Sequence, residues 1–269
     1  MKERIGALTL VSTESYTEPA CVLGFTLREQ GWPHATEVLV TADIGQSYRR
    51  VLSRWWDTIT EIEPIQSRLS GDLCWSPTVA NYTKLRLWTK TEYRRLIYLD
   101  ADTIVLGSLA DVIERPRFAA APCLWPPDAF NTGVLVLEPS DETFADMMAK
   151  SGILKSYDAS DQGFLNSYFS DWYDGPGDHR LPTKFNTSQF LYLYHASWRA
   201  VMEDIRVLHF TGPHKPWRTR SPFWRRVHLN IQKSLVKSAG GGPDPHALWW
   251  LARERMGAAE RAGESMVGT

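Results

Sequence analysis

The sequence predicts an α/β fold in which a mostly parallel central sheet is covered by helices on both faces. Two observations support this prediction. Short apolar runs of strand length alternate along the chain with longer segments of helical periodicity. The chain has 269 residues, of which 43% are hydrophobic and 23% charged, and this is enough for one large domain with its own core.

The first predicted strand is residues 5–11 (IGALTLV), and a helix follows over residues 18–30 until Gly31-Trp32-Pro33 ends it. The same patterns recur along the chain. Further strands are predicted at 37–41, 95–99, 132–137 and 206–209, and further helices at 48–56, 81–93, 142–150, 161–169 and 244–262. Residues 59–75 are predicted to be irregular and residues 263–269 to be disordered.

The glycine-rich sequence at residues 239–243 (AGGGP) predicts a flexible joint. It divides the chain into one domain, residues 1–238, and a C-terminal segment, residues 239–269, that holds the joint, one helix and the disordered end. The apolar side of that helix either packs on the domain or contacts a partner. We favour packing on the domain.

The overall composition excludes several classes of protein. A net charge of -1 gives no reason to expect binding to nucleic acid. Three widely spaced cysteines without a C-x-x-C pair argue against a disulfide framework or zinc knuckle and suit a reducing compartment. No apolar stretch reaches the length of a membrane span, so we expect a cytoplasmic protein. The glycine fingerprints of ATP- and NAD-binding folds are absent.

The strongest functional signal is a pair of carboxylates, Asp100 and Asp102, that directly follows the apolar strand at 95–99. Ligands of open α/β sheets bind beyond the carboxyl ends of strands, so both acids are expected to face the crevice. Carboxylates repel a diphosphate unless a divalent cation lies between them, which makes both residues candidate metal ligands. Ala101 is small enough to let a ligand lie close. The alternative is a strand end with two solvated caps.

A second signal follows the late strand, where His209 precedes Gly212 and Lys215. An imidazole beside two carboxylates gives a mixed nitrogen and oxygen site that suits Mn²⁺ better than Mg²⁺, although Mg²⁺ stays possible. Gly212 would let the backbone approach a phosphate, and Lys215 would add positive charge there. Alternatively, His209 is a core residue and the loop is only rigid.

Two further segments carry polar side chains suited to a sugar. Asn131 could bind sugar hydroxyls or only begin a strand with an Asx turn. In the segment 158–163 (DASDQG), Asp158, Asp161 and Gln162 are candidates for the sugar, whereas Asp158 or Ser160 could simply cap a helix.

The order and spacing of these segments resemble glycosyltransferase family 8, and within it the glycogenin-like members. The resemblance covers most of the chain. It runs through residues 10–16, 81–88, the D-x-D segment, 130–139, 158–169, 185–186 and 209–217, and it includes the double tryptophan 249–250. Where glycogenins carry an arginine near the diphosphate, this chain has Trp75, and its loop 63–80 is short.

The resemblance implies a GT-A type nucleotide-diphospho-sugar transferase fold, a UDP-sugar donor, Mn²⁺ and retention of anomeric configuration. By motif matching it implies roles for individual residues. The metal ligands are Asp100, Asp102 and His209; the uracil and ribose contacts are Leu10, Ser12, Thr13 and Tyr16; the sugar contacts are Asn131, Thr132, Asp158, Asp161 and Gln162; the phosphate contacts are Gly212 and Lys215; and Lys84 lies on the donor side. Asp161, Lys84 and Gln162 are the candidate catalytic residues.

The function implied is transfer of a hexose, glucose by default, from a UDP-sugar to a glycan or a small polyol. Alternatives are UDP-galactose or UDP-glucuronate as donor with inositol or a glycan as acceptor, a self-glucosylating glycogenin, a silent nucleotide-sugar binder, and a nucleotidyltransferase. A homodimer is expected from the habit of the family. An ungapped match to the acceptor tyrosine of glycogenins falls on Leu193, which has no hydroxyl, between Tyr192 and Tyr194. If this stretch is extended, Leu193 and its two neighbours cannot share a face.

Overall fold

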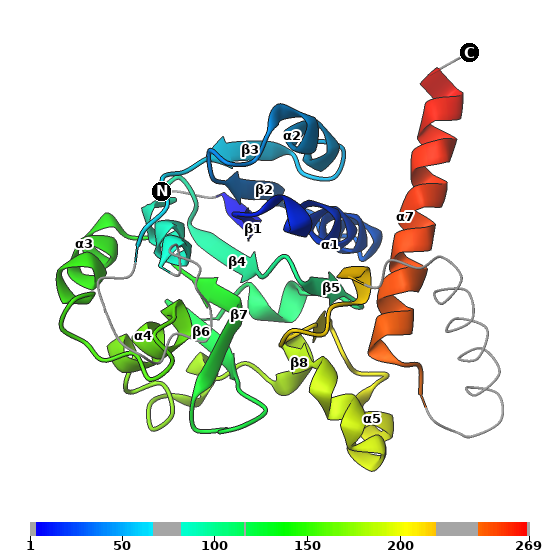
Figure 1. Cartoon of the computed structure of the whole chain (residues 1–269). Helices are drawn as coiled ribbons and strands as arrows, with labels where there is room; N and C mark the ends of the chain where they lie inside the picture. Colours follow the sequence, from blue (N-terminus) through cyan, green and yellow to red (C-terminus); the bar gives the residue numbers. More distant parts are fainter. Residues whose placement is uncertain (1–3, 67–81, 116, 219–241, 268–269) are drawn as a thin grey trace.

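The computed structural model describes residues 4–66, 82–115, 117–218 and 242–267, with side chains up to residue 262. It confirms the α/β fold: helices cover both faces of a six-stranded sheet, and a second sheet of three strands lies beside its edge (Figure 1). Trp75 and most of loop 63–80, where the sequence differs from glycogenins, lie outside the described residues. Asn81 and most of the glycine-rich joint also lie outside them.

The strands are β1 Ile5–Val11, β2 Ala35–Val40, β3 Thr58–Glu61, β4 Arg95–Leu99, β5 Thr103–Val105, β6 Phe118–Pro122, β7 Phe130–Leu137, β8 Thr187–Ser188 and β9 Val207–His209. The α-helices are α1 Thr17–Glu29, α2 Gln46–Leu52, α3 Asp141–Lys150, α4 Asp161–Tyr168, α5 His195–Val201 and α7 Pro245–Val267. Short 3₁₀ helices occur at Glu14–Tyr16, Thr83–Thr89, Ala110–Val112, Gly177–His179, Thr183–Phe185, Gln189–Leu193 and Pro216–Arg218.

The large sheet is mixed, with strand order β3-β2-β1-β4-β7-β6. β1 pairs in parallel with β2 and β4, and β2 pairs in parallel with β3, as expected for strands joined through helices. β7 runs antiparallel to both β4 and β6. The mostly parallel prediction therefore holds for three of the five strand pairs.

Alternation along the strands builds two separate cores. One face of the large sheet is covered by α1 and α7 and carries Ala7, Val38, Ile97 and Val136. The neighbours of these residues along each strand point to the opposite face, which packs against α3, α4 and the 3₁₀ helix Thr83–Thr89. Strands buried on both faces read as continuous apolar runs, which is why β1, β4 and β7 were predictable from the sequence.

Three predictions of local structure were wrong, and the short elements β5, β6, β8 and α5 were not predicted. The segment predicted as a helix at 81–93 is a 3₁₀ helix at Thr83–Thr89, where the Thr83 hydroxyl accepts the Ile65 N–H at 3.0 Å. β3 lies in the segment predicted to be irregular, and β5 and β6 were not predicted, because strands of three to five residues give too little periodicity. The helix α7 continues to Val267, into the segment predicted to be disordered.

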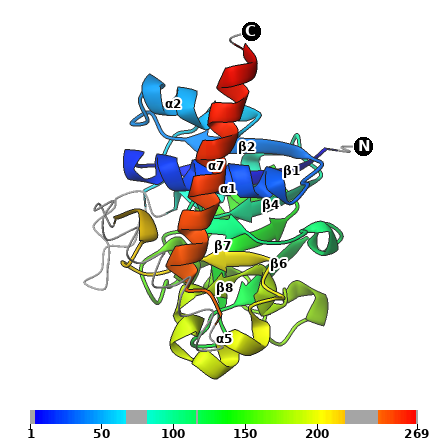
Figure 2. The same cartoon turned by 90° about the vertical axis from the view of Figure 1, so that its right-hand side faces the viewer.

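The C-terminal helix α7 lies along α1, and both views show it running past the edge of the domain (Figures 1 and 2). Trp249 and Trp250 are buried in the same core as α1. Arg253 pairs with Glu18 at 2.7 Å and Arg255 with Glu29 at 2.8 Å. The prediction that this helix packs on the domain is confirmed. Within the described chain, no helix has the length and apolar character of a membrane span.

One buried ionic network ties β2 to the segment before β4 and leads to a stability prediction. The carboxylate of Glu37, 1% exposed, accepts hydrogen bonds from Lys90 and from the Tyr93 hydroxyl, each at 2.7 Å. Replacing Glu37 by Ala removes the acceptor of the buried Tyr93 hydroxyl and leaves Lys90 with only the more exposed Glu92, so we expect a loss of about 3 kcal/mol in the free energy of unfolding.

The matched control is Glu92→Ala, because Glu92 pairs with the same Lys90 at 2.7 Å but keeps 44% of its side chain exposed. Exposed pairs contribute less than about 1 kcal/mol. Urea unfolding of both variants compares the two losses, and equal losses would contradict this account of the network.

Candidate functional site

The candidate site lies where β4 ends and β7 begins. Because β7 runs antiparallel to β4, its first residues lie beside the carboxyl end of β4. The Asp100 N–H donates to the Gly133 carbonyl at 2.8 Å, which fixes Asp100 next to Asn131 and Thr132. The sheet thus brings together two segments that are 30 residues apart in the sequence.

The small sheet adds His209 to this edge. β5 pairs with β9 so that Thr103 lies opposite His209, and the Phe210 N–H donates to the Asp102 carbonyl at 2.9 Å. His209 Nε2 lies 3.3 Å from Asp102 Oδ1 and 3.9 Å from Asp100 Oδ2. One ligand atom from each of the three residues lies within 4.8 Å of the others, so the cluster could hold a metal ion.

Two lysines neutralise part of the negative charge. Lys84 Nζ lies 3.1 Å from Asp100 and 3.0 Å from Asp161, and it donates to Thr132 Oγ1 at 3.1 Å. Burial acts to lower the pKa of Lys84, but Asp100 and Asp161 outweigh it and raise that pKa. The ammonium is therefore charged. Lys215 Nζ donates to Asp102 and to the Phe210 carbonyl.

The two buried aspartates respond differently to their surroundings. Burial acts to raise the pKa of Asp102, yet His209 and Lys215 outweigh it and hold this pKa well below its ordinary value. Burial raises the pKa of Asp161 despite the neighbouring Lys84. Asp102 is therefore a permanent carboxylate, as a metal ligand must be.

The donor set fits a divalent cation. Asp100, Asp102 and Asp161 carry three negative charges, and Lys84 and Lys215 carry two positive charges. Among the described residues of this cluster, one negative charge therefore remains at this edge of the sheet. Two carboxylates and one imidazole are ligands that Mn²⁺ accepts, whereas the nearest amides are engaged with each other. A divalent ion would reverse the local charge to positive, and a diphosphate would then be attracted rather than repelled.

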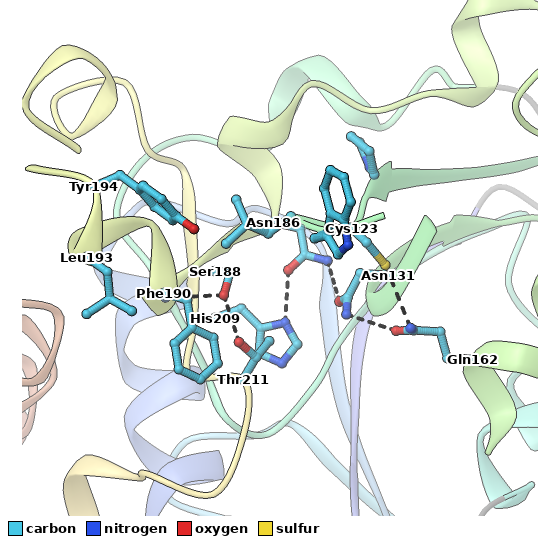
Figure 3. Close-up of a pocket in the computed structure, with 13 residues that line it drawn as sticks. Cys123, Asn131, Gln162, Asn186, Ser188, Phe190, Leu193, Tyr194, His209 and Thr211 are labelled. Atoms are coloured by element: carbon cyan, nitrogen blue, oxygen red, sulfur yellow. Dashed lines mark hydrogen bonds between the residues drawn. The ribbon is translucent and has the colours of Figure 1, made fainter. Parts of the chain in front are cut away.

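A series of amide hydrogen bonds sets the orientation of His209 (Figure 3). The Gly133 N–H can only donate, and it donates to Asn131 Oδ1 at 2.9 Å. Asn186 Nδ2 donates to the same oxygen at 2.8 Å, so Asn186 Oδ1 faces His209 Nδ1 at 3.0 Å. The imidazole donates from Nδ1, and in its neutral form the Nε2 lone pair faces the two aspartates.

Gly133 leaves the space that this arrangement needs. A Cβ atom at this position would lie 2.2 Å from His209 Cε1. No side chain can be accommodated there without displacing the imidazole.

Gln162 links the sugar candidates to this series. Its Oε1 accepts from Asn131 Nδ2 at 2.9 Å and from the Thr132 N–H at 3.4 Å. Thr132 Oγ1 in turn donates to Asp161 Oδ2 at 2.9 Å. Asn131, Thr132, Asp161 and Gln162 therefore form one connected group around Lys84.

Asp158 is held inside its own loop. Its Oδ1 accepts from the N–H groups of Ser160 at 2.9 Å and Gly163 at 3.0 Å, and its Oδ2 accepts from Ser160 Oγ at 2.7 Å. Ser160 Oγ accepts the Gln162 N–H at 3.1 Å, which confirms the helix-cap interpretation of Ser160. A contact of Asp158 with a sugar stays a prediction.

The predicted nucleoside residues lie at and after the carboxyl end of β1. Leu10 and Ser12 are half-buried and Thr13 is exposed. The Tyr16 ring lies edge-on to Trp217 at 5.7 Å. Burial raises the pKa of Tyr16, with Asp102 and Asp100 as further causes, which places this phenol near the metal candidates.

Two more predicted residues frame the same edge. Ala101 is buried between the two aspartates. Gly212 has a φ of +79°, a conformation that favours glycine, and it lies against the Phe190 ring.

Two positioning residues were not among the predicted site residues. Asn186 fixes His209, and the Tyr98 hydroxyl donates to Asp100 Oδ1 at 2.6 Å. Tyr98 precedes Asp100 by two residues on a strand, so side-chain alternation could have indicated the contact. For Asn186 the signal was its place in the family resemblance.

A pocket of about 410 Å³ opens beside this cluster. His209, Asn131, Gln162 and Asn186 lie at its inner end, and Figure 3 shows Leu193 and Tyr194 on the far side from Gln162. The pocket is lined by Pro122, Cys123, Leu124, Trp125, Asn131, Gln162, Asn186, Ser188, Phe190, Leu193, Tyr194, His209 and Thr211.

Comparisons with known proteins identify the family of this chain. The family model described as glycosyl transferase family 8 matches residues 113–221. Glycogenin-1 of Mus musculus is 33% identical over 248 residues, which cover 90% of this chain and 73% of that protein. The chain belongs to glycosyltransferase family 8. Inositol phosphorylceramide glucuronosyltransferase 1 of Arabidopsis thaliana is 30% identical. The match covers 90% of this chain and 49% of that protein.

Solved structures show the GT-A fold of this family 8 member. The glycosyltransferase GlyE of Streptococcus pneumoniae superposes with a TM-score of 0.63 at 18% identity and covers 93% of this chain and 61% of its own. The galactosyltransferase LgtC, solved with donor and acceptor sugar analogs, gives a TM-score of 0.59 at 18% identity and covers 81% and 91%.

The first site prediction concerns Asp102. An amide at this position keeps the shape of the side chain but removes the charge that a metal ion needs. We expect Asp102→Asn to lose at least 100-fold in transfer rate while it melts within a few degrees of the wild type. A rate near that of the wild type in the presence of Mn²⁺ would show that Asp102 holds no metal.

The second site prediction concerns Asn186, which does not itself belong to the metal cluster. Removing a hydrogen-bond partner of a metal-bound histidine costs roughly 10- to 100-fold in metal affinity. We expect this loss of Mn²⁺ affinity for Asn186→Ala, measured by calorimetric titration.

Asn166→Ala is the matched control, because its amide bonds the Phe130 backbone at 2.9 Å, away from the metal candidates. We expect it to lower the melting temperature without changing Mn²⁺ affinity. Equal Mn²⁺ affinities for the two variants would contradict the positioning role of Asn186.

Proposed function

We propose that this glycosyltransferase transfers a hexose from a UDP-sugar to an acceptor hydroxyl, with Mn²⁺ and with retention of anomeric configuration. The observation that carries the proposal is the cluster of Asp100, Asp102 and His209 at the end of β4, with two charged lysines beside it. With a divalent ion bound, this cluster would carry the positive charge that a leaving diphosphate needs as its own negative charge develops.

Each part of the cluster has a separate task in this proposal. A bound divalent ion acts as a Lewis acid toward the diphosphate. Lys84 and Lys215 add fixed positive charge at the same place. Tyr16 and the residues before it hold the nucleoside, and Gly212 allows the backbone to approach a phosphate.

Retention requires either a covalent carboxylate intermediate or attack on the same face as the leaving group. Asp161 Oδ2 already contacts Lys84 at 3.0 Å and the Thr132 hydroxyl at 2.9 Å. We therefore assign Asp161 and Gln162 to orienting the sugar and Lys84, and we favour attack on the same face.

Glucose is the hexose that we propose, because several relatives at 33% or 34% identity are named glycogenin. Transfer of glucuronate or galactose is the alternative, since a glucuronosyltransferase is 30% identical. We further propose a cytoplasmic homodimer in which residues 1–238 carry the transferase domain. The apolar side of α7 covers the core of that domain and leaves little of itself for a partner.

A separate acceptor, a glycan or a small polyol, is the main proposal, and self-glycosylation is the second candidate. The segment Gln189–Leu193 is a 3₁₀ helix and not a strand. The argument that Leu193 and its flanking tyrosines cannot share a face assumed an extended chain, so it does not apply here. Leu193 and Tyr194 both line the pocket. Tyr192 packs against Trp198 at 5.7 Å instead. Tyr194 is therefore the one residue of the three whose hydroxyl the pocket presents.

The test is a screen of UDP-sugars for hydrolysis, with Mn²⁺ and then with excess chelator. We expect UDP-glucose to be hydrolysed, with at least a tenfold loss of rate when the metal is removed, because the diphosphate would face uncompensated carboxylates. Hydrolysis that is insensitive to the chelator would contradict the metal-dependent mechanism, and hydrolysis of none of the UDP-sugars would contradict the proposed function.

The same incubations distinguish the two acceptors. Intact-mass measurement is expected to show an unmodified chain. A ladder of hexose additions that is absent from Tyr194→Phe would instead establish self-glycosylation at Tyr194.

A further inference from the structure

We propose that the outer half of the 410 Å³ pocket binds a neutral sugar unit of an acceptor glycan, stacked on Trp125 and Tyr194. This inference rests on the proposed function, since it assigns the acceptor side of the same site. It names a substrate class and two binding residues that the metal cluster and the family resemblance leave open.

The two halves of the pocket differ in chemistry. Its inner end consists of His209 and the amides of Asn131, Gln162 and Asn186, which belong to the metal and donor side. Thr132 and Asp161, the other donor candidates, do not line it. The remaining residues come from two segments, 122–125 after β6 and 188–194 after β8, to which the donor site assigns no task.

Exposed apolar side chains gather on these two segments. Trp125 is 85% exposed, Leu193 70%, Tyr194 61% and Leu124 45%. All four line one pocket, whereas exposed large apolar residues are usually scattered. Leaving them in contact with water is unfavourable, so this concentration indicates a surface that a ligand covers.

A sugar ring matches this mixture of groups. One face of a pyranose presents C–H groups that pack on an aromatic ring, and its edge presents hydroxyls that need hydrogen-bond partners. The pocket offers rings at its mouth and, deeper, the hydroxyls of Ser188 and Thr211, which bond each other at 2.7 Å. An acceptor hydroxyl at the inner end would lie beside the donor amides, as transfer requires.

The sugar should be uncharged. Of the described residues that line the pocket, none is Asp, Glu, Lys or Arg. Burial raises the pKa of the Cys123 thiol to about 11, so this group is also neutral. A phosphate or uronate in the pocket would lose water without gaining a partner of opposite charge, and this is costly. The two lysines that could pair with a phosphate, Lys84 and Lys215, contact Asp100 and Asp102 and do not line the pocket.

The surface continues beyond the pocket toward Tyr157. Gln162 Nε2 donates to the Tyr157 hydroxyl at 2.9 Å and contacts Cys123 Sγ at 3.7 Å, so Tyr157 lies next to the 122–125 segment. Tyr157 is 52% exposed. This adjacency provides room for a second sugar unit, which favours an oligosaccharide over a monosaccharide.

The experiment separates donor chemistry from acceptor binding. UDP-glucose hydrolysis and transfer are measured for the wild type, Trp125→Ala, Trp125→Phe and Tyr173→Ala, with maltotriose, cellotriose and xylotriose as neutral probes and inositol 1-phosphate as an anionic probe. Saturation-transfer NMR with the same probes reports binding independently of turnover. Tyr173 is the matched control, an aromatic that is 54% exposed and does not line the pocket.

We expect at least one neutral trisaccharide to bind and serve as acceptor. We expect Trp125→Ala to raise its KM about tenfold or more and to leave UDP-glucose hydrolysis unchanged, Trp125→Phe to restore most of the affinity, and Tyr173→Ala to have no effect. An unchanged KM in Trp125→Ala, tighter binding of inositol 1-phosphate than of the trisaccharides, or binding of no trisaccharide would each overturn the inference. A wild type that binds a trisaccharide but hydrolyses no UDP-sugar would refute the proposed function alone.

Discussion

An imbalance of charge at the meeting point of two sheets governs the arrangement of the site. In the part of the chain that the structure describes, Asp100, Asp102 and Asp161 pair with two ammonium groups, those of Lys84 and Lys215. Such a cluster is stable only if every oxygen is held by donors or a cation. The hydroxyls of Tyr98 and Thr132 supply donors, and the remaining negative charge explains why a divalent ion suits this place.

The metal cluster was predictable from the sequence because its parts sit at strand ends. Asp100 and Asp102 follow an apolar run, so the rule for strand ends brings both to one edge of the large sheet. His209 ends another apolar run, and its pairing with β5 in the small sheet brings it to the same place. Asn186 could not be derived this way, since its role depends on the register between β8 and β9. The orientation of Tyr194 also depended on backbone conformation, because a 3₁₀ helix and a strand direct the same residues differently.

The fold separates two kinds of chemistry on either side of His209. Charged groups lie toward the 3₁₀ helix Thr83–Thr89 and the loop of Lys215, and uncharged groups line the pocket on the other side. In the proposed function, a donor with a diphosphate and an acceptor without charge would meet without sharing any binding group except the amides between them. The proposed sites would then distinguish the two substrates by their charge as well as by their shape.

Aromatic contacts connect α7 to Tyr16, a residue proposed to hold the nucleoside, although α7 does not line the pocket. Trp249 lies 5.5 Å from the Trp217 ring, and Trp217 in turn lies 5.7 Å from Tyr16. A stop codon ahead of residue 245 would therefore remove the support of a residue assigned to the substrate, and not just a peripheral helix. In genetic terms, a truncation that spares every ligand of the metal cluster would still be inherited as a loss of function.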